Sequence, residues 1–533
     1  MGKAASTGSV RDPLTATTSF ACLIVAFSSW FTGGYSSAQI NVPQNLIIQW
    51  IRQIQCARIT DHLAPAGVSL NGTHTDVVLW CSVIAENETS LHLRNNGRLG
   101  AIWSMIGCGV MLGVSVGFLV ANHLVEWLGF RKTLLVFNVL EMMGSIAAGC
   151  GVTARSYELF IIGRFIFGVG NACVVVCGVY VAEISTNNHR GSLNVLATAS
   201  FSVGILLANV VGLPQLLGTP DNWQHTCWIC LVPSLILIAA YRFLPESPRW
   251  LCRKQQDTGK LAAVLQLLRG RQNVDADICA IQDELEAAQK LSSQKLSIPD
   301  LFRDRFLRKI TGICLLVMAA QRLTGFSAVF VYSTEIFRQC GITQALASYG
   351  TIILTALSAV VALLGSPLQD IFGRRPMLLG GLFGCALCTA VMVVFTVLTK
   401  YAACNTCQYG NLVAMTLFMV CYAVGPASAP FLFTAEMFGM SSRQSASALG
   451  YLVNVSLATV ITAVFPAMQA YLMEWTFTIF TGITFILAVF LSTVLVETKG
   501  KSFLEIQSML EDRFCAGRKA SLESMISQRT DLE

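Results

Sequence analysis

Long uncharged stretches recur along this chain. Residues 13–51, 99–125, 191–220, 339–369, 401–435, 444–473 and 475–496 contain no Asp, Glu, Lys or Arg. A helix of about 20 apolar residues crosses a bilayer, and in lipid the backbone must bond to itself, which excludes open sheets. With five further apolar segments, these stretches predict twelve membrane helices centred near residues 28, 110, 142, 169, 202, 234, 322, 354, 388, 423, 457 and 485. Three of the helices contain a single charge, namely Glu141, Arg164 or Arg322.

The composition agrees with a lipid environment. Hydrophobic residues make up 54% of the 533 residues and charged residues 12%, against about 25% charged in soluble domains. The first apolar segment, residues 17–40, lacks a small-residue cleavage site, so we interpret it as a membrane helix and not as a signal peptide. The predicted fold class is an all-α protein embedded in the lipid bilayer.

Two hydrophilic segments, residues 52–97 and 245–309, set the orientation. The side that holds both termini and residues 245–309 carries 26 of the 36 Lys and Arg residues. Positive charge marks the cytoplasmic side, so residues 52–97 are expected outside, where Asn71 and Asn87 stand in N-glycosylation triplets. Among the 19 cysteines, Cys56 with Cys81 and Cys404 with Cys407 are disulfide candidates on that side.

An internal repeat divides the chain. Gly129-Phe-Arg-Lys132 recurs as Gly373-Arg-Arg-Pro376, and Pro245-Glu-Ser-Pro-Arg249 corresponds to Val496-Glu-Thr-Lys-Gly500. The repeat predicts two six-helix halves joined by a charged linker. The predicted boundaries are a cytoplasmic tail at 1–16, a bundle at 17–244, helical linkers at 245–309, a second bundle at 310–496 and a cytoplasmic tail at 497–533.

Two such halves are typical of an alternating-access transporter. Glu183 and Arg190 stand seven residues apart, as do Glu436 and Arg443. Glu–Arg pairs at the cytoplasmic ends would form a reversible latch, because exposed pairs contribute about 0–1 kcal/mol each. The alternative is that these charges only set topology. The predicted cytoplasmic gate comprises Glu183, Arg190, Glu436, Arg443, Arg131, Arg164, Arg374, Arg375, Glu246 and Arg249.

Several motifs occur together and in order. They are Ile40-Asn-Val-Pro-Gln44, Gly163-Arg-Phe165, Pro245-Glu-Ser-Pro-Arg249, Gly425-Pro426 and Glu497-Thr-Lys-Gly500. With them the chain resembles the sugar-porter branch of the major facilitator superfamily, and in particular the animal facilitative glucose transporters. The resemblance extends from Gly34 to Gly500. It implies a central sugar site, short helices within residues 245–309 and residence in the plasma membrane.

The sugar contacts that the resemblance implies are partly replaced. Where the family has Gln-Gln-Leu-Ser-Gly, this chain has Gln321-Arg-Leu-Thr-Gly325, and a family tryptophan corresponds to Phe431. Amides suit vicinal hydroxyls because they both donate and accept, and Thr or Ser shortens that reach. The implied substrate-binding residues are Gln321, Arg322, Ser327, Thr198, Thr355, Phe431 and Asn454.

Three functions remain open. The leading one is facilitative uniport of a hexose, glucose or fructose, because residues 17–40 hold no carboxylate of the kind that proton-driven relatives are expected to use. The second is an organic-anion carrier, for example of urate-like solutes, that uses Arg322. The third is a receptor-like relative that does not transport. We expect Arg322 either to face the solute or to pair with Glu141 or Glu335.

An enzyme is not expected. The six histidines are scattered, which predicts no metal site, and the chain has no phosphate-binding loop of the Gly-x4-Gly-Lys-Ser/Thr kind. We therefore expect no cofactor, no ATP-driven pumping and no nucleic-acid partner. The expected partners are a small solute and the lipid bilayer.

Overall fold

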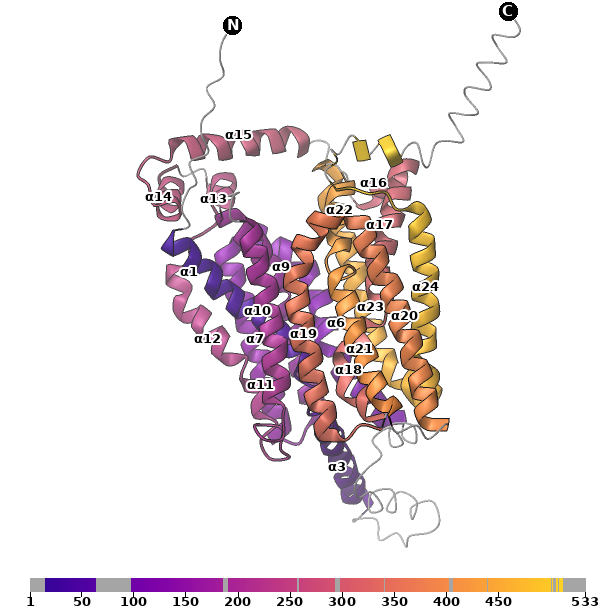
Figure 1. The fold of residues 1–533 in the computed structure, drawn as a ribbon. Helices are drawn as coiled ribbons and strands as arrows, with labels where there is room; N and C mark the ends of the chain where they lie inside the picture. Colours follow the sequence, from indigo (N-terminus) through magenta and orange to yellow (C-terminus); the bar gives the residue numbers. More distant parts are fainter. Residues whose placement is uncertain are drawn as a thin grey trace, which may run out of the picture. The chain divides into compact units, whose positions relative to one another are not determined.

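The computed structural model describes residues 15–63, 97–185, 190–255, 258–292, 298–339, 341–401, 406–438 and 440–499, and residues 501, 505, 506 and 508–510. The regular elements in these ranges are all helices. The chain divides into two compact units, residues 1–85 with 109–290 and residues 86–108 with 291–533. Each unit is a bundle of long helices with shorter helices at one end (Figure 1).

Twelve apolar segments occur within the described ranges, and their positions confirm the predicted membrane helices. Ten candidate spans are long and apolar enough to cross a membrane; one of them, Ser445–Val494, covers two helices, and the apolar helix Leu196–Val211 is shorter. The segments are α1 to α2 (Ala16–Val25, Ala26–Phe31, Thr32–Ala38), α6 (Gly97–Leu128), α7 (Phe130–Thr153), α8 with α9 (Tyr157–Asn171, Cys173–Ile184), α10 (Arg190–Val211), α11 with α12 (His225–Trp228, Leu231–Ala240), α17 with α18 (Arg305–Leu323, Phe326–Gln339), α19 (Gln344–Phe372), α20 (Arg374–Tyr401), α21 with α22 (Cys407–Val424, Ala429–Met437), α23 (Met440–Leu472) and α24 (Thr476–Val494).

Large apolar side chains lie exposed on the outer faces of these helices. Leu119 of α6, Leu387 of α20 and Ile486 of α24 are 57%, 67% and 67% exposed. Water would disfavour such surfaces, whereas hydrocarbon would not. Both units are therefore built for a lipid solvent.

Glycines bring α7 and α8 together in the first unit. A Cβ at Gly144 would lie 2.3 Å from the backbone N of Phe167, and one at Gly163 would lie 2.4 Å from the N of Ala148. Small residues of this kind let membrane helices approach closely. The short helices α13 (Pro248–Gln255), α14 (Thr258–Arg269) and α15 (Asp275–Ser292) follow, and Thr15 before α1 donates to the Leu268 carbonyl over 2.9 Å.

Helix breaks shape the second unit. The seventh segment breaks at Gly325, whose φ of +86° is left-handed and where a Cβ would lie 3.0 Å from the Phe480 ring. Glycine reaches that conformation without strain. The tenth segment breaks over residues 425–428, beside Pro426. The short helix α16 (Ile298–Arg303) places Leu301 in the core with Ile506 and Leu510.

Within the described residues, two cysteines are disulfide-bonded. They are Cys56, in α3 (Gln44–Leu63), and Cys407, at the start of α21. Both belong to the pairs that the sequence offered as candidates, and their partners lie outside the described residues.

Candidate functional site

In the second unit, the helix breaks at Gly325 and at residues 425–428 leave backbone groups available in the same region. Gln321 stands near the end of α17, one turn before the break at Gly325, and its Nε2 donates to the carbonyl of Ala427 over 2.8 Å. Ala427 lies in the break between α21 and α22. Unwound backbone at membrane depth is tolerated where other groups satisfy it, and discontinuous helices often form transporter sites.

A chain of amides continues from Gln321 to α23. The Nδ2 of Asn454 donates to the Oε1 of Gln321 over 2.5 Å and to the carbonyl of Met318 over 3.1 Å. Asn454 is fully buried and Gln321 is 3% exposed. Each amide is thus held at a fixed orientation, as specific recognition of a polar solute requires.

Arg322 completes this arrangement. Its Nε–H donates to the Oδ1 of Asn454 over 2.9 Å, and its guanidinium lies 6.0 Å from the centre of the Phe326 ring. Its side chain is half-buried. Within the described residues the four N–H bonds of its two Nη groups have no hydrogen-bond acceptor. Glu335, a partner considered from the sequence, is instead paired with Arg338 over 3.0 Å.

Aromatic rings flank the guanidinium. Phe326 stacks on Tyr422 with ring centres 3.8 Å apart and planes 6° apart. The positive charge of Arg322 interacts electrostatically with the hydroxyl groups of Tyr422 and Tyr451. The second unit thus presents amides, a cation and aromatic faces together.

The remaining predicted contacts are placed as follows. Ser327 is buried beside the break, and its Oγ has no hydrogen-bond partner within the described residues. Thr355 is buried and donates to the carbonyl of Thr351 in its own helix over 2.9 Å. Phe431 is 39% exposed, with its ring centre 6.3 Å from that of Tyr451. Thr198 is exposed on α10, in the first unit.

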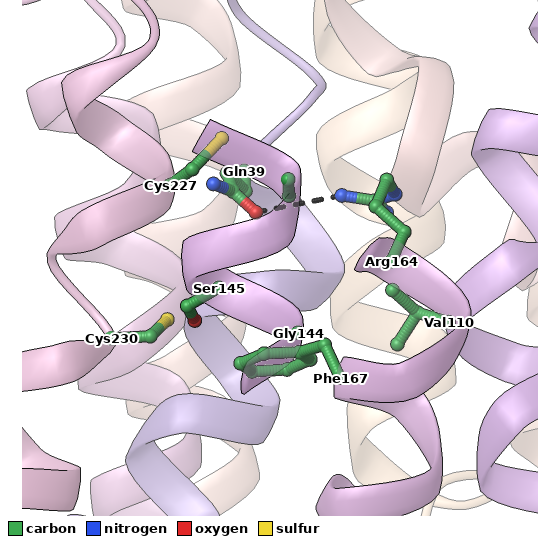
Figure 2. A pocket seen from close by; sticks show the side chains of 9 residues that line it. Gln39, Val110, Gly144, Ser145, Arg164, Phe167, Cys227 and Cys230 are labelled. Carbon is green, nitrogen blue, oxygen red and sulfur yellow. Dashed lines mark hydrogen bonds between the residues drawn. The ribbon is translucent and has the colours of Figure 1, made fainter. Parts of the chain in front are cut away.

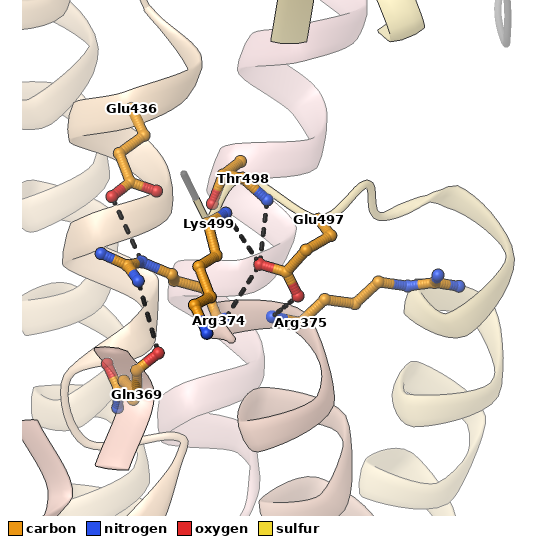
Figure 3. A network of polar contacts seen from close by, with 7 residues as sticks. All are labelled: Gln369, Arg374, Arg375, Glu436, Glu497, Thr498 and Lys499. Carbon is orange, nitrogen blue, oxygen red and sulfur yellow. Dashed lines mark hydrogen bonds and ion pairs between the residues drawn. The ribbon is translucent and has the colours of Figure 1, made fainter. Parts of the chain in front are cut away.

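At one end of the second unit, Glu497 caps α20 (Figure 3). Its carboxylate accepts backbone N–H bonds from Arg374, Arg375, Thr498 and Lys499 over 2.9–3.0 Å. A carboxylate is favourable there because the N–H groups of a helix start carry partial positive charge. Gly373, directly before this helix, has a φ of +98°.

The same network includes two residues of the predicted gate, Arg374 and Glu436, although the pair predicted from the sequence was Glu436 with Arg443. Arg374 donates its Nε–H to Glu436 over 3.3 Å and an Nη1–H to the carbonyl of Gln369 over 3.3 Å (Figure 3). Arg375 turns away and donates to the carbonyl of Ser492 over 2.7 Å. One gate arginine therefore bonds a gate glutamate, and the other bonds backbone.

The first unit repeats this architecture. Glu246 accepts N–H bonds from Phe130, Arg131 and Ser247 over 2.9–3.2 Å and so caps α7, whose start is Gly129 with a φ of +86°. Burial raises the pKa of Glu246 above its ordinary value, and these N–H donors oppose the rise. Glu183 accepts a hydrogen bond from the Ser247 hydroxyl.

Other predicted gate residues have different surroundings. Arg131 donates to the carbonyl of Tyr241 over 3.1 Å and lies 4.3 Å from the centre of its ring. Arg249, at the start of α13, is half-buried. The side chains of Arg190 and Arg443 lie outside the described residues, as do Asn71 and Asn87.

Arg164 lies away from the Glu246 end of the first unit. Helix α7 runs 24 residues from that end, about 36 Å, before α8 begins at Tyr157. Arg164 is 4% exposed, donates to Gln39 over 3.4 Å and lines a small cavity with Cys227 and Cys230 (Figure 2). The gate prediction had placed Arg164 at the other end because it followed the family motif and not the direction of the helix.

Several residues at these sites were not singled out from the sequence. Phe326, Tyr422 and Tyr451 surround Arg322, and Gln39 faces Arg164. Phe326 stands four residues after Arg322 but beyond the helix break, so the regular spacing of a helix does not relate the two. The tyrosines belong to other helices, and no local pattern links them to Arg322. No group of three or more His, Cys, Asp or Glu that could hold a metal occurs within the described ranges.

Known proteins resemble this chain over nearly its whole length. Residues 21–510 match the family described as "Sugar (and other) transporter". The facilitated glucose transporter member 2 of Mus musculus is 31% identical over 93% of this chain and 94% of its own. Member 5 of Equus caballus is 30% identical over 92% of each chain.

Solved structures share the fold. The inward-open xylose transporter XylE from E. coli superposes with a TM-score of 0.69 at 18% identity, over 92% of this chain and 99% of that one. A partially occluded form of XylE gives a TM-score of 0.68 over 92% of this chain and 100% of that one. The chain therefore belongs to the family described as "Sugar (and other) transporter" and is a multi-pass membrane protein homologous to the facilitated glucose transporters.

Proposed function

We propose that this protein is a facilitative uniporter that moves a hexose, glucose or fructose, by alternating access. The amide chain of Gln321 and Asn454, held at two helix breaks, carries the proposal. Amides offer donors and acceptors to vicinal hydroxyls, and Arg322 offers donors to hydroxyl oxygens. The relatives named facilitated glucose transporters support this choice of solute.

Uniport is supported by the first membrane segment. It contains no acidic residue, and Gln39 at its end accepts a hydrogen bond from Arg164 over 3.4 Å. A proton-driven transporter would need a titratable group that is loaded on one side and emptied on the other. We propose that solute therefore moves down its own gradient.

We further propose that both termini and residues 245–309 are cytoplasmic, in the plasma membrane. In the first unit, the disulfide-bonded Cys56 lies in α3, and Arg58 of the same helix pairs with Glu158 at the start of α8 over 2.5 Å. Glu246 caps the N-terminal end of α7, which is the end away from α8 in the chain. In the second unit, the disulfide-bonded Cys407 follows the C-terminal end of α20, whereas Glu497 caps the N-terminal end of α20. Because disulfides persist in oxidising compartments, both cysteine ends face outward.

The charged ends then form the proposed gate. Glu436 with Arg374, and Glu183 with Ser247, are partners that can separate at low free-energy cost. Arg190 and Arg443 are proposed as further partners of these glutamates. Neutralising any one of the four charges is expected to change the rate of cycling more than the stability of the fold.

A second function is favoured by one observation. The Nη groups of Arg322 have no acceptor among the described residues, and a guanidinium fork suits a carboxylate or another anionic oxygen. An organic-anion carrier, for example of urate-like solutes, would use that fork. A receptor-like protein without transport is the third possibility.

Uptake by purified protein in vesicles tests these functions. We expect labelled glucose or fructose to enter vesicles that contain the protein and to reach the outside concentration without exceeding it. Accumulation that a protonophore collapses would refute uniport. Uptake of organic anions without hexose would favour the second function, and binding of either solute without uptake would favour the third.

A further inference from the structure

The first unit buries a carboxyl group for which the proposed function has no use. Glu141, in the middle of α7, has no exposed surface. The Nδ2 of Asn171, on α8, lies 3.0 Å from its Oε1, and the hydroxyl of Thr32, on α2, lies 3.3 Å from its Oε2. Three helices thus converge on one acidic side chain. A Cβ at Gly170 would lie 2.8 Å from its Cγ, so the packing is close.

No cation balances this carboxyl. Within the described residues Glu141 forms no ion pair. The titratable groups that face it are the thiols of Cys173, on α9, and Cys230, before α12. Arg164 lines the same cavity as Cys230, and its guanidinium donates to the Oε1 of Gln39. An unpaired charge at membrane depth costs at least about 2.5–3.5 kcal/mol.

The number of hydrogen-bond donors around Glu141 indicates how its carboxyl group is held. The hydroxyl of Thr32 has one proton, and its shortest contact is the Ser28 carbonyl at 2.8 Å. When that proton bonds to Ser28, the Thr32 oxygen is left as an acceptor toward Glu141. A protonated Glu141 then donates its O–H to Thr32 and accepts the Asn171 N–H. Every group is satisfied by a neutral acid, whereas an anion would compete with Ser28 for the Thr32 proton.

We propose that Glu141 is a proton-binding site: it holds a proton at neutral pH, and loss of that proton at alkaline pH stalls transport. The anion would attract the Thr32 proton and so break the bond from the Thr32 hydroxyl to the Ser28 carbonyl within the first membrane segment. Thr32 directly follows the π-helical stretch Ala26–Phe31, a feature that often marks functional sites in helices. The proton stays bound through each cycle at neutral pH, so uniport stoichiometry is unchanged.

A route for the proton lies next to the site. Ser145, one turn after Glu141 on α7, lines the cavity that also holds Cys230, Gln39 and Arg164 (Figure 2). Cys230, whose thiol faces Glu141, lines the same cavity and lies between the carboxyl and these polar groups in the proposed route. The positive charge of Arg164 would slow a hydronium there, so exchange is expected to be slow compared with transport.

Infrared spectroscopy of the purified protein tests the bound proton without any transport. The difference between wild type and Glu141→Gln at neutral pH should contain the C=O band of one protonated carboxyl, and the band should vanish as the pH is raised. Glutamine keeps a donor toward Thr32 and an acceptor toward Asn171, so the variant should fold. Absence of the band at neutral pH would overturn the proposal.

The pH dependence of solute uptake tests the consequence. Wild-type uptake should fall at alkaline pH by about tenfold per pH unit beyond the titration of Glu141, and Glu141→Gln should lack that fall. The matched control is Glu158→Gln, which removes a carboxylate that is paired with Arg58 at the surface and should retain the wild-type profile. Identical profiles for wild type and Glu141→Gln, or a flat wild-type profile, would contradict the proposal.

Discussion

The Nε–H of Arg322 donates to the Oδ1 of Asn454 over 2.9 Å, and the two residues, on different helices, are 132 positions apart in sequence. This single bond orients the guanidinium and leaves its four other N–H donors available. It also fixes the Asn454 amide so that its Nδ2 faces Gln321. The cation and the two amides therefore act as one group, and a change in any of them is expected to alter solute selection.

Substituting Arg322 with Gln should shift selection toward neutral solutes. Glutamine restores an acceptor for sugar hydroxyls and removes the charge that favours anions. A charge-assisted hydrogen bond contributes about 1.5–3 kcal/mol, so the affinity for an anionic solute should fall by about 10- to 100-fold while hexose uptake rises. Competition of organic anions against labelled hexose in vesicles measures both.

The control for this substitution is Arg322→Lys. Lysine retains the positive charge but not the fork, so anion competition should weaken less than in Arg322→Gln. If neither variant changes the relative uptake of hexoses and anions while protein reaches the membrane, Arg322 has a structural role and does not contact the solute.

Removing the Asn454 side chain should destabilise the second unit. Asn454→Ala leaves Gln321, Arg322 and the Met318 carbonyl each without one partner. Each buried polar group left unsatisfied costs about 1–3 kcal/mol. The thermal unfolding midpoint in detergent should therefore drop, and the KM for hexose should rise. Thr459→Ala, which removes a hydroxyl bonded within α23, should change neither by a comparable amount.

Glu497 should stabilise the start of α20. Its carboxylate accepts four backbone N–H bonds. Loss of a helix cap costs about 0.5–2 kcal/mol, so Glu497→Ala should lower the unfolding midpoint more than Glu497→Gln, which keeps one oxygen acceptor. Glu126→Ala removes an exposed carboxylate from α6 and serves as the control. Equal midpoints for all three variants would show that the cap does not contribute.

The gate charges should control rate. Changing Glu183, Glu436, Arg190 or Arg443 to Gln removes one proposed latch partner, which contributes about 0–1 kcal/mol. Uptake should slow by up to about fivefold, while the yield of folded protein stays the same. Initial uptake rates and the accessibility of an engineered surface cysteine on either side measure the two effects. Unchanged rates and unchanged accessibility in all four variants would refute the latch.

Membrane topology can be tested independently. Asn71 and Asn87 should carry glycan, because the loop that holds them is proposed to face outward. Glycosidase treatment of membrane-expressed protein should increase its gel mobility, and the Asn71→Gln, Asn87→Gln double variant should not respond. No shift for wild type, together with a shift for acceptor sites placed within residues 255–295, would invert the orientation.

The membrane helices could be predicted because their pattern is local. Twenty apolar residues without charge leave few alternatives in lipid. Even the helices interrupted by Glu141, Arg164 and Arg322 were predicted correctly, since one charge in a long apolar run can be buried among helices. The breaks at Gly325 and at residues 425–428 were not predicted as such, although glycine and proline mark both.

The candidate site could be predicted only in part. The resemblance identified Gln321 and Asn454 as surviving contacts, but their mutual bond depends on how α17 packs against α23. The sequence suggests Glu335 as a partner for Arg322, but Glu335 pairs with Arg338, which stands only three residues away in the same helix. Arg164 was assigned to the gate by motif, whereas its partner Gln39 stands 125 residues earlier. Partners that are distant in sequence follow from packing, which no single segment encodes.

Counterflow of a labelled hexose tests the central claim most directly. Purified protein in vesicles preloaded with unlabelled glucose or fructose should take up the labelled sugar faster than empty vesicles do, because a uniporter returns loaded as well as empty. Gln321→Ala, which removes one proposed sugar contact, should reduce this exchange. The account is contradicted if no hexose shows counterflow under conditions in which the protein is folded and inserted in the membrane.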